Sequence, residues 1–221
     1  MGSITRSFAN NITTSGVLLP ASLTNNSIAN VTAYNAAIST GGMKLISTQT
    51  ASNSASISFT TGIDSTYKEY QFYFINIHAR TNATEFTFQG STNAGSSYGV
   101  TLTSTAFRIA HQESGAGQFG PEYAGSHDLA QSTSFQNLTS AGGGISSDAD
   151  MAENGTLSIF NPSSTTYVKH WLSNFSHYNV DVYSHHNFHA GYFNTTSAIN
   201  AVQFKMISGN FDGTILMYGI V

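Results

Sequence analysis

Apolar and polar side chains alternate with a period of two along most of the chain after residue 42, and this alternation predicts β-strands. The stretch Glu69–His78 (EYQFYFINIH) is apolar or aromatic on both of its predicted faces. Such a strand is typical of the centre of a sheet, where the core covers one face and a neighbour or another subunit covers the other. The two predicted faces are Tyr70, Phe72 and Phe74, and Tyr73, Ile75 and Ile77.

Shorter stretches with the same pattern predict further strands on both sides of a loop-rich middle, His111–Asn154, which holds most of the clustered glycines. Within that middle we expect long loops around one or two weaker strands, near Glu122–Ala130 and Ser134–Leu138. The clearer predicted strands are Met43–Thr50, Ser54–Thr61, Thr84–Ser91, Val100–Ala110, Gly155–Phe160, Thr165–Phe175, Asn187–Phe193, Ile199–Ile207 and Thr214–Ile220.

The connections complete the expected fold. Ser208–Gly213 (SGNFDG) joins the last two predicted strands, and its Asn, Asp and Gly residues predict a hairpin loop. We find no convincing helix and no short-period internal repeat, which disfavours a propeller or a solenoid. Residues 43–221 are therefore expected to form one all-β domain, a two-sheet antiparallel β-sandwich of jelly-roll type.

Residues 1–42 differ from the rest of the chain in their density of apolar residues, which is too low for a core and too high for a plain linker. A frayed terminus is one interpretation. The other is an extended N-terminal arm that docks onto a partner. Its expected anchors are Val17, Leu18, Leu19, Pro20, Leu23, Ile28 and Val31.

The charge content is unusual, since only 8% of residues are charged, against about 25% in an average soluble domain. The seven Lys and Arg residues are scattered singly, which argues against a nucleic-acid partner. The chain has no cysteine, and it has neither a signal-peptide pattern nor an apolar stretch long enough to span a membrane. This composition is typical of a rigid β-shell that is built into a larger particle or displayed on it.

Aromatic residues suggest both a core and a contact surface. Some aromatic residues lie in predicted strands and are expected to pack in the core, namely Trp171, Tyr167, Phe72 and Phe74. Tyr123, Tyr178 and Tyr183 are assigned to loops, where an exposed ring could stack on a sugar or anchor a partner. Ordinary packing of these tyrosines within their loops is the alternative.

The densest polar cluster is Ser176–His189. Residues 185, 187 and 189 of a strand share one face, so His185 and His189 could both reach a metal ion. Zinc requires three or four ligands, and His177 or Asp181 would have to supply the third. The simpler interpretation is a polar loop whose histidines act as neutral hydrogen-bonding groups, and no metal or other cofactor is expected.

No motif predicts an enzyme. Gly-x-Ser-x-Gly is absent, and the glycine spacing at Gly115–Gly120 is a chance match in a loop. Glu113 and Glu122 are the nearest candidates for a glycosidase pair, but nothing singles them out. Asp148, Asp150 and Glu153 fail the spacing of a calcium loop, which leaves a solvated acidic loop.

Four stretches of the β-region and the leader Ile12–Thr32 carry a resemblance to a known family. The four are Ser56–Arg80 (SISFTTGIDSTYKEYQFYFINIHAR), Phe160–His170 (FNPSSTTYVKH), Ala190–Ile199 (AGYFNTTSAI) and Phe204–Ile220 (FKMISGNFDGTILMYGI). They resemble a β-domain common in structural proteins of marine tailed bacteriophages, including cyanophages and phages of pelagic heterotrophs. The resemblance covers most of the chain, thins across the loop-rich middle and carries no catalytic residues.

The resemblance implies a virion protein exposed on the capsid or in the tail fibre. We expect a non-enzymatic structural protein, made in the host cytoplasm and assembled into the virion as a capsid decoration, knob or head fibre. Its expected partners are other virion proteins, reached through the arm, and further copies of itself, with a homotrimer as the favoured assembly. The alternative is a tail-fibre receptor-binding tip or a carbohydrate-binding, lectin-like module that attaches to a host-surface glycan.

Overall fold

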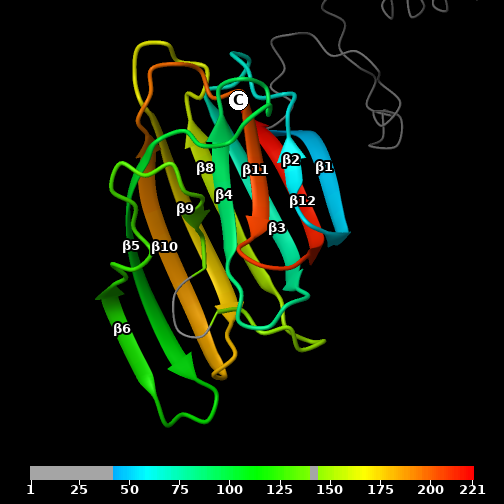
Figure 1. Ribbon diagram of the computed structural model, residues 1–221, viewed down its shortest axis with the longest axis vertical. Helices are drawn as coiled ribbons and strands as arrows, with labels where there is room; N and C mark the ends of the chain where they lie inside the picture. Colours follow the sequence, from blue (N-terminus) through cyan, green and yellow to red (C-terminus); the bar gives the residue numbers. More distant parts are fainter. Residues whose placement is uncertain (1–41, 140–143) are drawn as a thin grey trace, which may run out of the picture. The chain divides into compact units, whose positions relative to one another are not determined.

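The computed structural model describes residues 42–139 and 144–221, and its twelve regular elements there are all β-strands (Figure 1). Eight of them form one antiparallel sheet: β1 (Met43–Ser54), β12 (Phe211–Ile220), β3 (Glu69–Ala79), β8 (Glu153–Phe160), β9 (Lys169–Tyr178), β10 (Tyr183–Phe193), β5 (Leu102–Gln112) and β6 (Gln118–Tyr123), in that order across the sheet. The other sheet has the order β2 (Ile57–Phe59), β11 (Ala201–Met206), β4 (Phe86–Ser91) and β7 (Gln136–Asn137).

The two sheets pack face to face around one apolar core, so the predicted two-sheet antiparallel β-sandwich is confirmed. Figure 1 shows the small sheet in front of the β1–β9 part of the large one. The strand β1 begins at Met43, where the β-domain was expected to begin. The chain divides into the units Met1–Thr40 and Gly41–Val221, and the predicted arm, including all seven of its anchor residues, lies outside the described residues.

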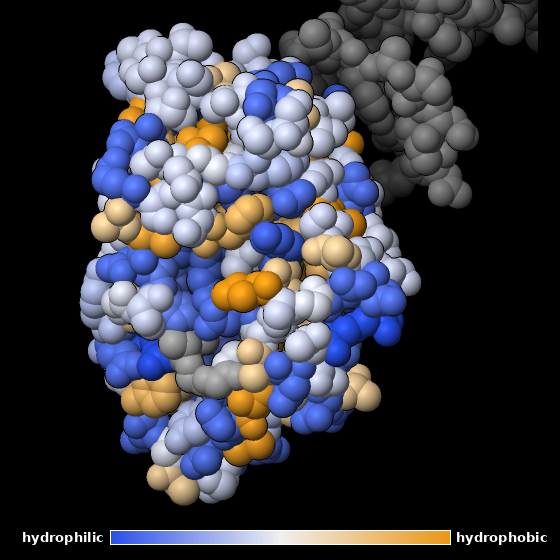
Figure 2. All heavy atoms as spheres, in the orientation of Figure 1, coloured by the Kyte–Doolittle hydropathy of each residue, from blue (hydrophilic) through white to orange (hydrophobic). Residues whose placement is uncertain are grey.

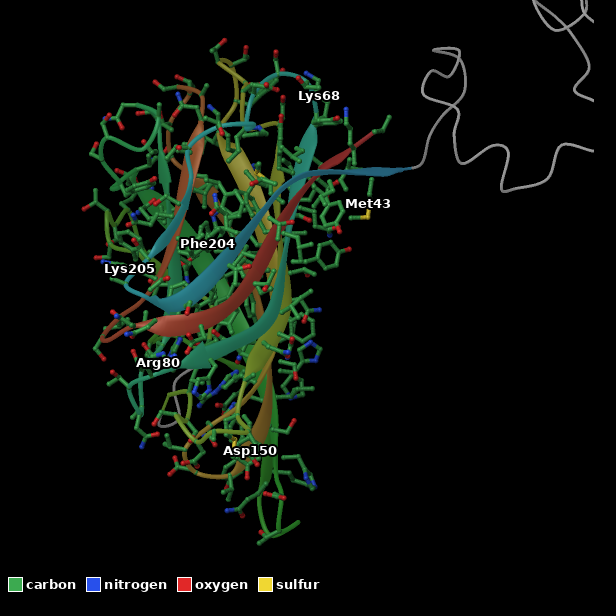
Figure 3. All side chains as sticks on the ribbon, turned by 90° about the vertical axis from the view of Figure 1, so that its right-hand side faces the viewer. Met43, Lys68, Arg80, Asp150, Phe204 and Lys205 are labelled. Atoms are coloured by element: carbon green, nitrogen blue, oxygen red, sulfur yellow. The ribbon has the colours of Figure 1, made fainter. Side chains whose placement is uncertain are left out.

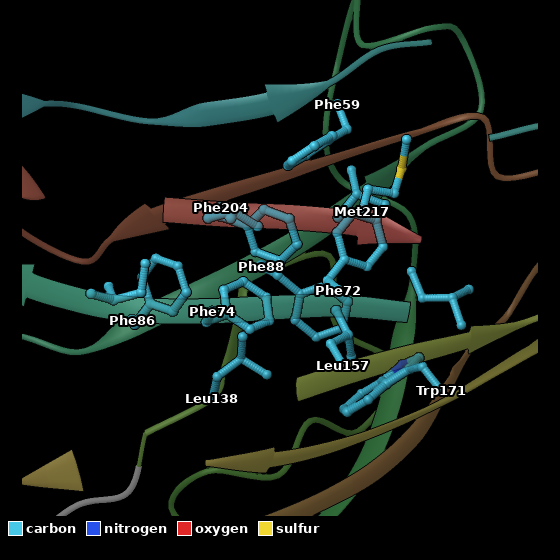
Figure 4. Packing of buried hydrophobic residues seen from close by; sticks show 14 of the residues in the cluster. Phe59, Phe72, Phe74, Phe86, Phe88, Leu138, Leu157, Trp171, Phe204 and Met217 are labelled. Carbon is cyan, nitrogen blue, oxygen red and sulfur yellow. The ribbon is translucent and has the colours of Figure 1, made fainter. Parts of the chain in front are cut away.

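The core is a network of aromatic rings contributed by both sheets (Figure 4). Phe204 of β11 lies 5.3 Å from Phe72 and 5.0 Å from Phe74, both in β3, in edge-to-face contacts. Trp171 of β9 is fully buried and meets Phe88 of β4 edge-on at 5.0 Å, which confirms its predicted place in the core. The same prediction is wrong for Tyr167, which is 69% exposed because it lies in the connection before β9 rather than in the strand. Edge-to-face pairs add to the stability that burial of these rings supplies.

The strand β3 is central, as predicted, but one of its face assignments is wrong. Tyr70, Phe72 and Phe74 point into the core, whereas Ile75 is 46% exposed on the other side. Ile77 was expected beside Ile75, yet it is fully buried. A β-bulge at Asn76, which has a φ of 51°, inserts one extra residue and returns Ile77 to the inward face.

The predicted hairpin between the last two strands is also wrong. The strands β11 and β12 lie in different sheets, so the connection crosses from one layer of the sandwich to the other. Thr84 holds this crossing, because its Oγ1 donates to the carbonyl of Ser208 and accepts from the Ser208 amide, both at 3.1 Å. Turn-forming residues therefore mark the bend here without identifying which strands it joins.

The loop-rich middle contains two short strands whose bounds differ from the prediction. The strand β6 spans Gln118–Tyr123 rather than Glu122–Ala130, although Gly120-Pro121 lies inside it. Proline cannot donate a ladder hydrogen bond, and β6 tolerates it because it is an edge strand paired with β5 alone. The strand β7 is reduced to Gln136–Asn137 at the edge of the small sheet.

Candidate functional site

The outward face of the large sheet carries side chains that the core does not use. The strand register aligns them in two neighbouring rows across β8, β9, β10 and β5. The first row is Thr156, Asn174, Phe188 and Phe107, and the second is Ser158, Leu172, Ala190 and Thr105. Hydroxyl, amide and aromatic groups are therefore interleaved on one surface.

A groove with a volume of about 340 Å³ is lined by the side chains of both rows and by Ser173 and His189. The hollow exists because Ala190 has a smaller side chain than its neighbours in the row, Leu172 and Thr105. None of the described residues that line this groove is Asp, Glu, Lys or Arg. This volume falls in the range of about 300–1,000 Å³ that is usual for small-molecule sites.

Aromatic rings form one end of the groove. The rings of Phe107 and Phe188 stack with centroids 4.7 Å apart and planes inclined by 11°. The imidazole of His186 packs on Phe188, with the two ring centroids 4.3 Å apart. His186 Nε2 also makes a hydrogen bond with Asn174 Oδ1, which fixes the amide of Asn174 beside the stack. Phe107 nevertheless remains 47% exposed.

A second hollow of about 280 Å³ lies on the same face at the β1–β12–β3 end, and it is lined by three apolar residues and two tyrosines. It is bordered by Met43, Tyr73, Ile75, Leu216 and Tyr218, which we call the β1–β3 patch. In Figure 3, Met43 and Phe204 lie on opposite sides of the large sheet, so the patch faces away from the core. The opposite surface, over the small sheet, is mainly polar (Figure 2).

The three tyrosines proposed as glycan contacts lie in strands rather than in loops, which corrects that assignment. Tyr123 ends β6 opposite Phe107, is 64% exposed, and its hydroxyl bonds to Asp128. Tyr178 ends β9, and its hydroxyl donates to Glu113 at 2.5 Å. Tyr183 begins β10 and packs against Phe119. They form no single cluster, and sugar contact by them stays a prediction.

The histidines considered as metal ligands point inward. His185 and His189 share the buried face of β10 with Asn187, as the strand period predicted. His177 of β9 stacks on His185 with ring centroids 5.0 Å apart, and its Nδ1 is 2.9 Å from Asn187 Nδ2. The β6–β7 connection adds a fourth buried histidine, His127. No group of three or more His, Asp or Glu side chains in the described residues has a metal-binding arrangement.

Burial keeps these four rings neutral. Desolvation, with the charge of His185 next in size, lowers the pKa of His177 to about 3. Burial, followed by His127, lowers the pKa of His189 to about 3. Burial also lowers the pKa values of His127 and His185 to about 4, and in both cases Arg108 adds to the shift. These imidazoles therefore act as polar packing groups at neutral pH.

The acidic candidates are separated by the fold. Glu122 pairs with Arg108 at 2.7 Å on the β5–β6 edge, and Glu113 accepts the bond from Tyr178. Asp148 and Asp150 are exposed, as expected for a solvated loop, but Glu153 is fully buried at the start of β8. Burial raises the pKa of Glu153 well above its usual value. The expectation of a solvated loop is therefore wrong for Glu153.

Sequence reasoning missed the groove itself. Leu172 and Phe188 lie at outward positions of β9 and β10, where a half-buried sheet normally places polar residues. The available signal was the same two-faced pattern that marked Glu69–His78. No helix in the described ranges is long and apolar enough to cross a membrane. Comparison of the chain with protein-family models, curated proteins and solved structures gives no match.

Proposed function

We propose that this chain is a non-enzymatic structural protein of a tailed-phage virion, displayed on the particle by its N-terminal arm. The observation that carries the proposal is the eight-stranded sheet, whose outward face offers apolar and aromatic side chains to a partner while its inward face builds a self-sufficient core. Exposed apolar surface of this kind marks interaction sites. The phage assignment draws on the resemblance of the four stretches described above.

The finer fold class that we propose is a jelly roll. Its support is a nested set of pairings, in which β1 pairs with β12, β2 with β11, β3 with β8 and β4 with β7. A long hairpin wrapped into two sheets produces this nesting, which is the pattern of a jelly roll. The remaining strands β5, β6, β9 and β10 are added beside β8 and enlarge one sheet.

We further propose that copies of the chain associate through the β1–β3 patch, with a trimer as the favoured state. Ile75 and Met43 are 46% and 41% exposed there, and Tyr73 stacks edge-on with Tyr218 at 5.5 Å. The patch lies at the start of the β-domain, so association would bring several arms together and strengthen attachment through multivalency.

Purified particles test this function. Antibody labelling against the chain should decorate intact particles in electron micrographs, and the protein should co-sediment with them through a density gradient. A chain that lacks residues 1–42 should fold and remain soluble but should not sediment with the particles. Absence of the full-length protein from purified particles would refute the proposal.

The second candidate function is attachment to a host glycan, either from a tail-fibre tip or as a lectin-like module. The specific observation in its favour is the uncharged groove between the two outward rows, with the Phe107–Phe188 stack at one end.

A further inference from the structure

We propose that the groove across β8, β9, β10 and β5 binds a neutral oligosaccharide. This inference deepens the proposed function, because it names a ligand for the displayed β-domain. It rests on that function only for the expectation that the sugar belongs to the host surface. The groove crosses four strands, which are three inter-strand steps of about 4.8 Å each, or about 14 Å. It is therefore longer than one pyranose ring, so a short oligosaccharide fits it better than a monosaccharide.

The aromatic end of the groove suits the apolar face of a sugar ring. The faces of aromatic rings carry a partial negative charge, which attracts the C–H groups that line one side of a pyranose. Phe107 and Phe188 are held nearly parallel, and His186 backs the stack, so little side-chain freedom remains to be lost on binding. Phe107 is still 47% exposed, so a ligand that covers it gains the free energy of burying apolar surface.

The polar side chains of the groove suit sugar hydroxyls. Thr156 and Asn174 are cross-strand partners, and Ser158 and Thr105 stand at the two ends of the second row. Each of these groups can donate and accept hydrogen bonds, as a hydroxyl requires. Since His186 occupies Asn174 Oδ1, the amide NH₂ of Asn174 is oriented by that bond and can donate to a ligand oxygen.

The uncharged lining of the groove determines which class of ligand it suits. None of its described lining residues carries a formal charge at neutral pH, so an acidic sugar, a phosphate or a nucleotide would lose solvation without gaining an ionic partner. A second copy of the chain is the other occupant to consider. The β1–β3 patch fits that role better, because the only polar side-chain groups among its described lining residues are the hydroxyls of Tyr73 and Tyr218, whereas Ser, Thr and Asn side chains line the groove.

The test uses the full chain on an array of neutral and acidic oligosaccharides, followed by titration calorimetry with the neutral glycan that binds best. Phe107→Ala and Asn174→Ala should each weaken the affinity about tenfold or more. Ala190→Leu should abolish binding by filling the floor of the groove. Tyr167→Ala is the matched control, since Tyr167 is 69% exposed outside the groove and its loss should leave the affinity unchanged.

The outcomes separate this inference from the proposed function. If the wild type binds neutral glycans and this binding is lost in Phe107→Ala, Asn174→Ala and Ala190→Leu, the groove is the binding site. No binding to any neutral glycan, binding only to acidic ones, or binding unchanged in all three variants overturns it. A change of oligomeric state in Phe107→Ala or Ala190→Leu also overturns it, because the groove would then be a contact between copies. In each of these cases co-sedimentation with particles still tests the virion role separately.

Discussion

The indole of Trp171 occupies the space that a side chain at Gly191 would need. The two residues are cross-strand partners on the inward face of β9 and β10, and a Cβ placed at position 191 would collide with the indole ring and with the carbonyl oxygen of Thr103. The absence of a side chain at Gly191 therefore lets the largest side chain of the core lie flat against the neighbouring strand. This pair joins the added strands of the large sheet to the central core through the contact of Trp171 with Phe88.

Gly191→Ala should destabilise the domain by about 1–3 kcal/mol, since the Trp171 ring would have to move within a packed core. The measurement is chemical denaturation followed by tryptophan fluorescence, as Trp171 is the sole tryptophan of the chain. Gly99→Ala is the control, because a Cβ there meets nothing closer than the carbonyl oxygen of Thr133 at 3.9 Å. Equal stability of Gly191→Ala and wild type would show that the core is loose around the indole.

Trp171→Ala should cost about 3–5 kcal/mol of folding free energy, because it leaves a cavity between Phe88 and β9. Trp171→Phe should cost clearly less, since it keeps an aromatic ring against Phe88 and removes an indole N–H that has no hydrogen-bond partner among the described residues. Circular dichroism melts of the two variants compare these values. A near-neutral Trp171→Ala would contradict the burial of the ring.

How far the sequence predicts this fold depends on how local each feature is. The inward set Tyr70, Phe72 and Phe74 and the burial of Trp171 follow from the period-two pattern alone, and the structure confirms them. The position of Ile77 does not follow, because the bulge at Asn76 changes the period by one residue. The crossing between β11 and β12 could not be predicted either, since a turn sequence does not reveal whether its strands share a sheet.

The candidate site shows the same limit. His185 and His189 share a strand face, which their spacing predicts, but their neighbour His177 comes from another strand through the register of β9 with β10. The groove forms because β5 pairs with β10, although β5 is distant in sequence from the consecutive strands β8, β9 and β10. The joint position of Phe107, Asn174 and Phe188 could therefore not be read from composition. Only the apolar residues at outward positions gave a signal for it.

The domain should lose stability in acid as its buried histidines become protonated on unfolding. The pKa of His189 is about 3 in the fold against 6.5 when exposed, so between these values the unfolded state binds a proton that the folded state does not. Stability present above pH 6.5 is then lost as the pH falls, at up to about 1.4 kcal/mol per pH unit for each such histidine. Denaturation midpoints measured from pH 7 to pH 4 should fall accordingly.

His189→Phe isolates one of these groups. Neither ring nitrogen of His189 has a hydrogen-bond partner among the described residues, so phenylalanine keeps the buried ring and removes only the titration. Between pH 7 and pH 4.5 the free energy of unfolding of the variant should fall by about 2–3 kcal/mol less than that of the wild type. His170→Phe, at an exposed position, is the control. Identical slopes for His189→Phe and wild type would mean that His189 is solvated in the fold.

Glu153 should produce the opposite pH dependence. Burial raises its pKa well above 4.5, so the folded state retains a proton that the unfolded state releases as the pH rises above about 4.5. Its contribution to stability is therefore greatest in acid and is lost as the pH rises through the folded pKa. Glu153→Gln should gain stability relative to wild type from pH 5 to pH 8, measured by thermal melting. A relative loss over that range would indicate a paired carboxylate, and Asp150→Asn, at an exposed position, is the control.

Ile75→Asp tests whether the β1–β3 patch joins copies of the chain. Ile75 is 46% exposed beside Tyr73, so a carboxylate there is solvated in the monomer but loses its water in an apolar interface. Analytical ultracentrifugation should find the wild type as an oligomer, with a trimer favoured, and Ile75→Asp as a monomer with an unchanged circular dichroism spectrum. Ile207→Asp, at a 62% exposed residue outside the patch, should keep the wild-type mass. Dissociation by both variants, or a monomeric wild type at micromolar concentration, would remove the patch as the contact between copies.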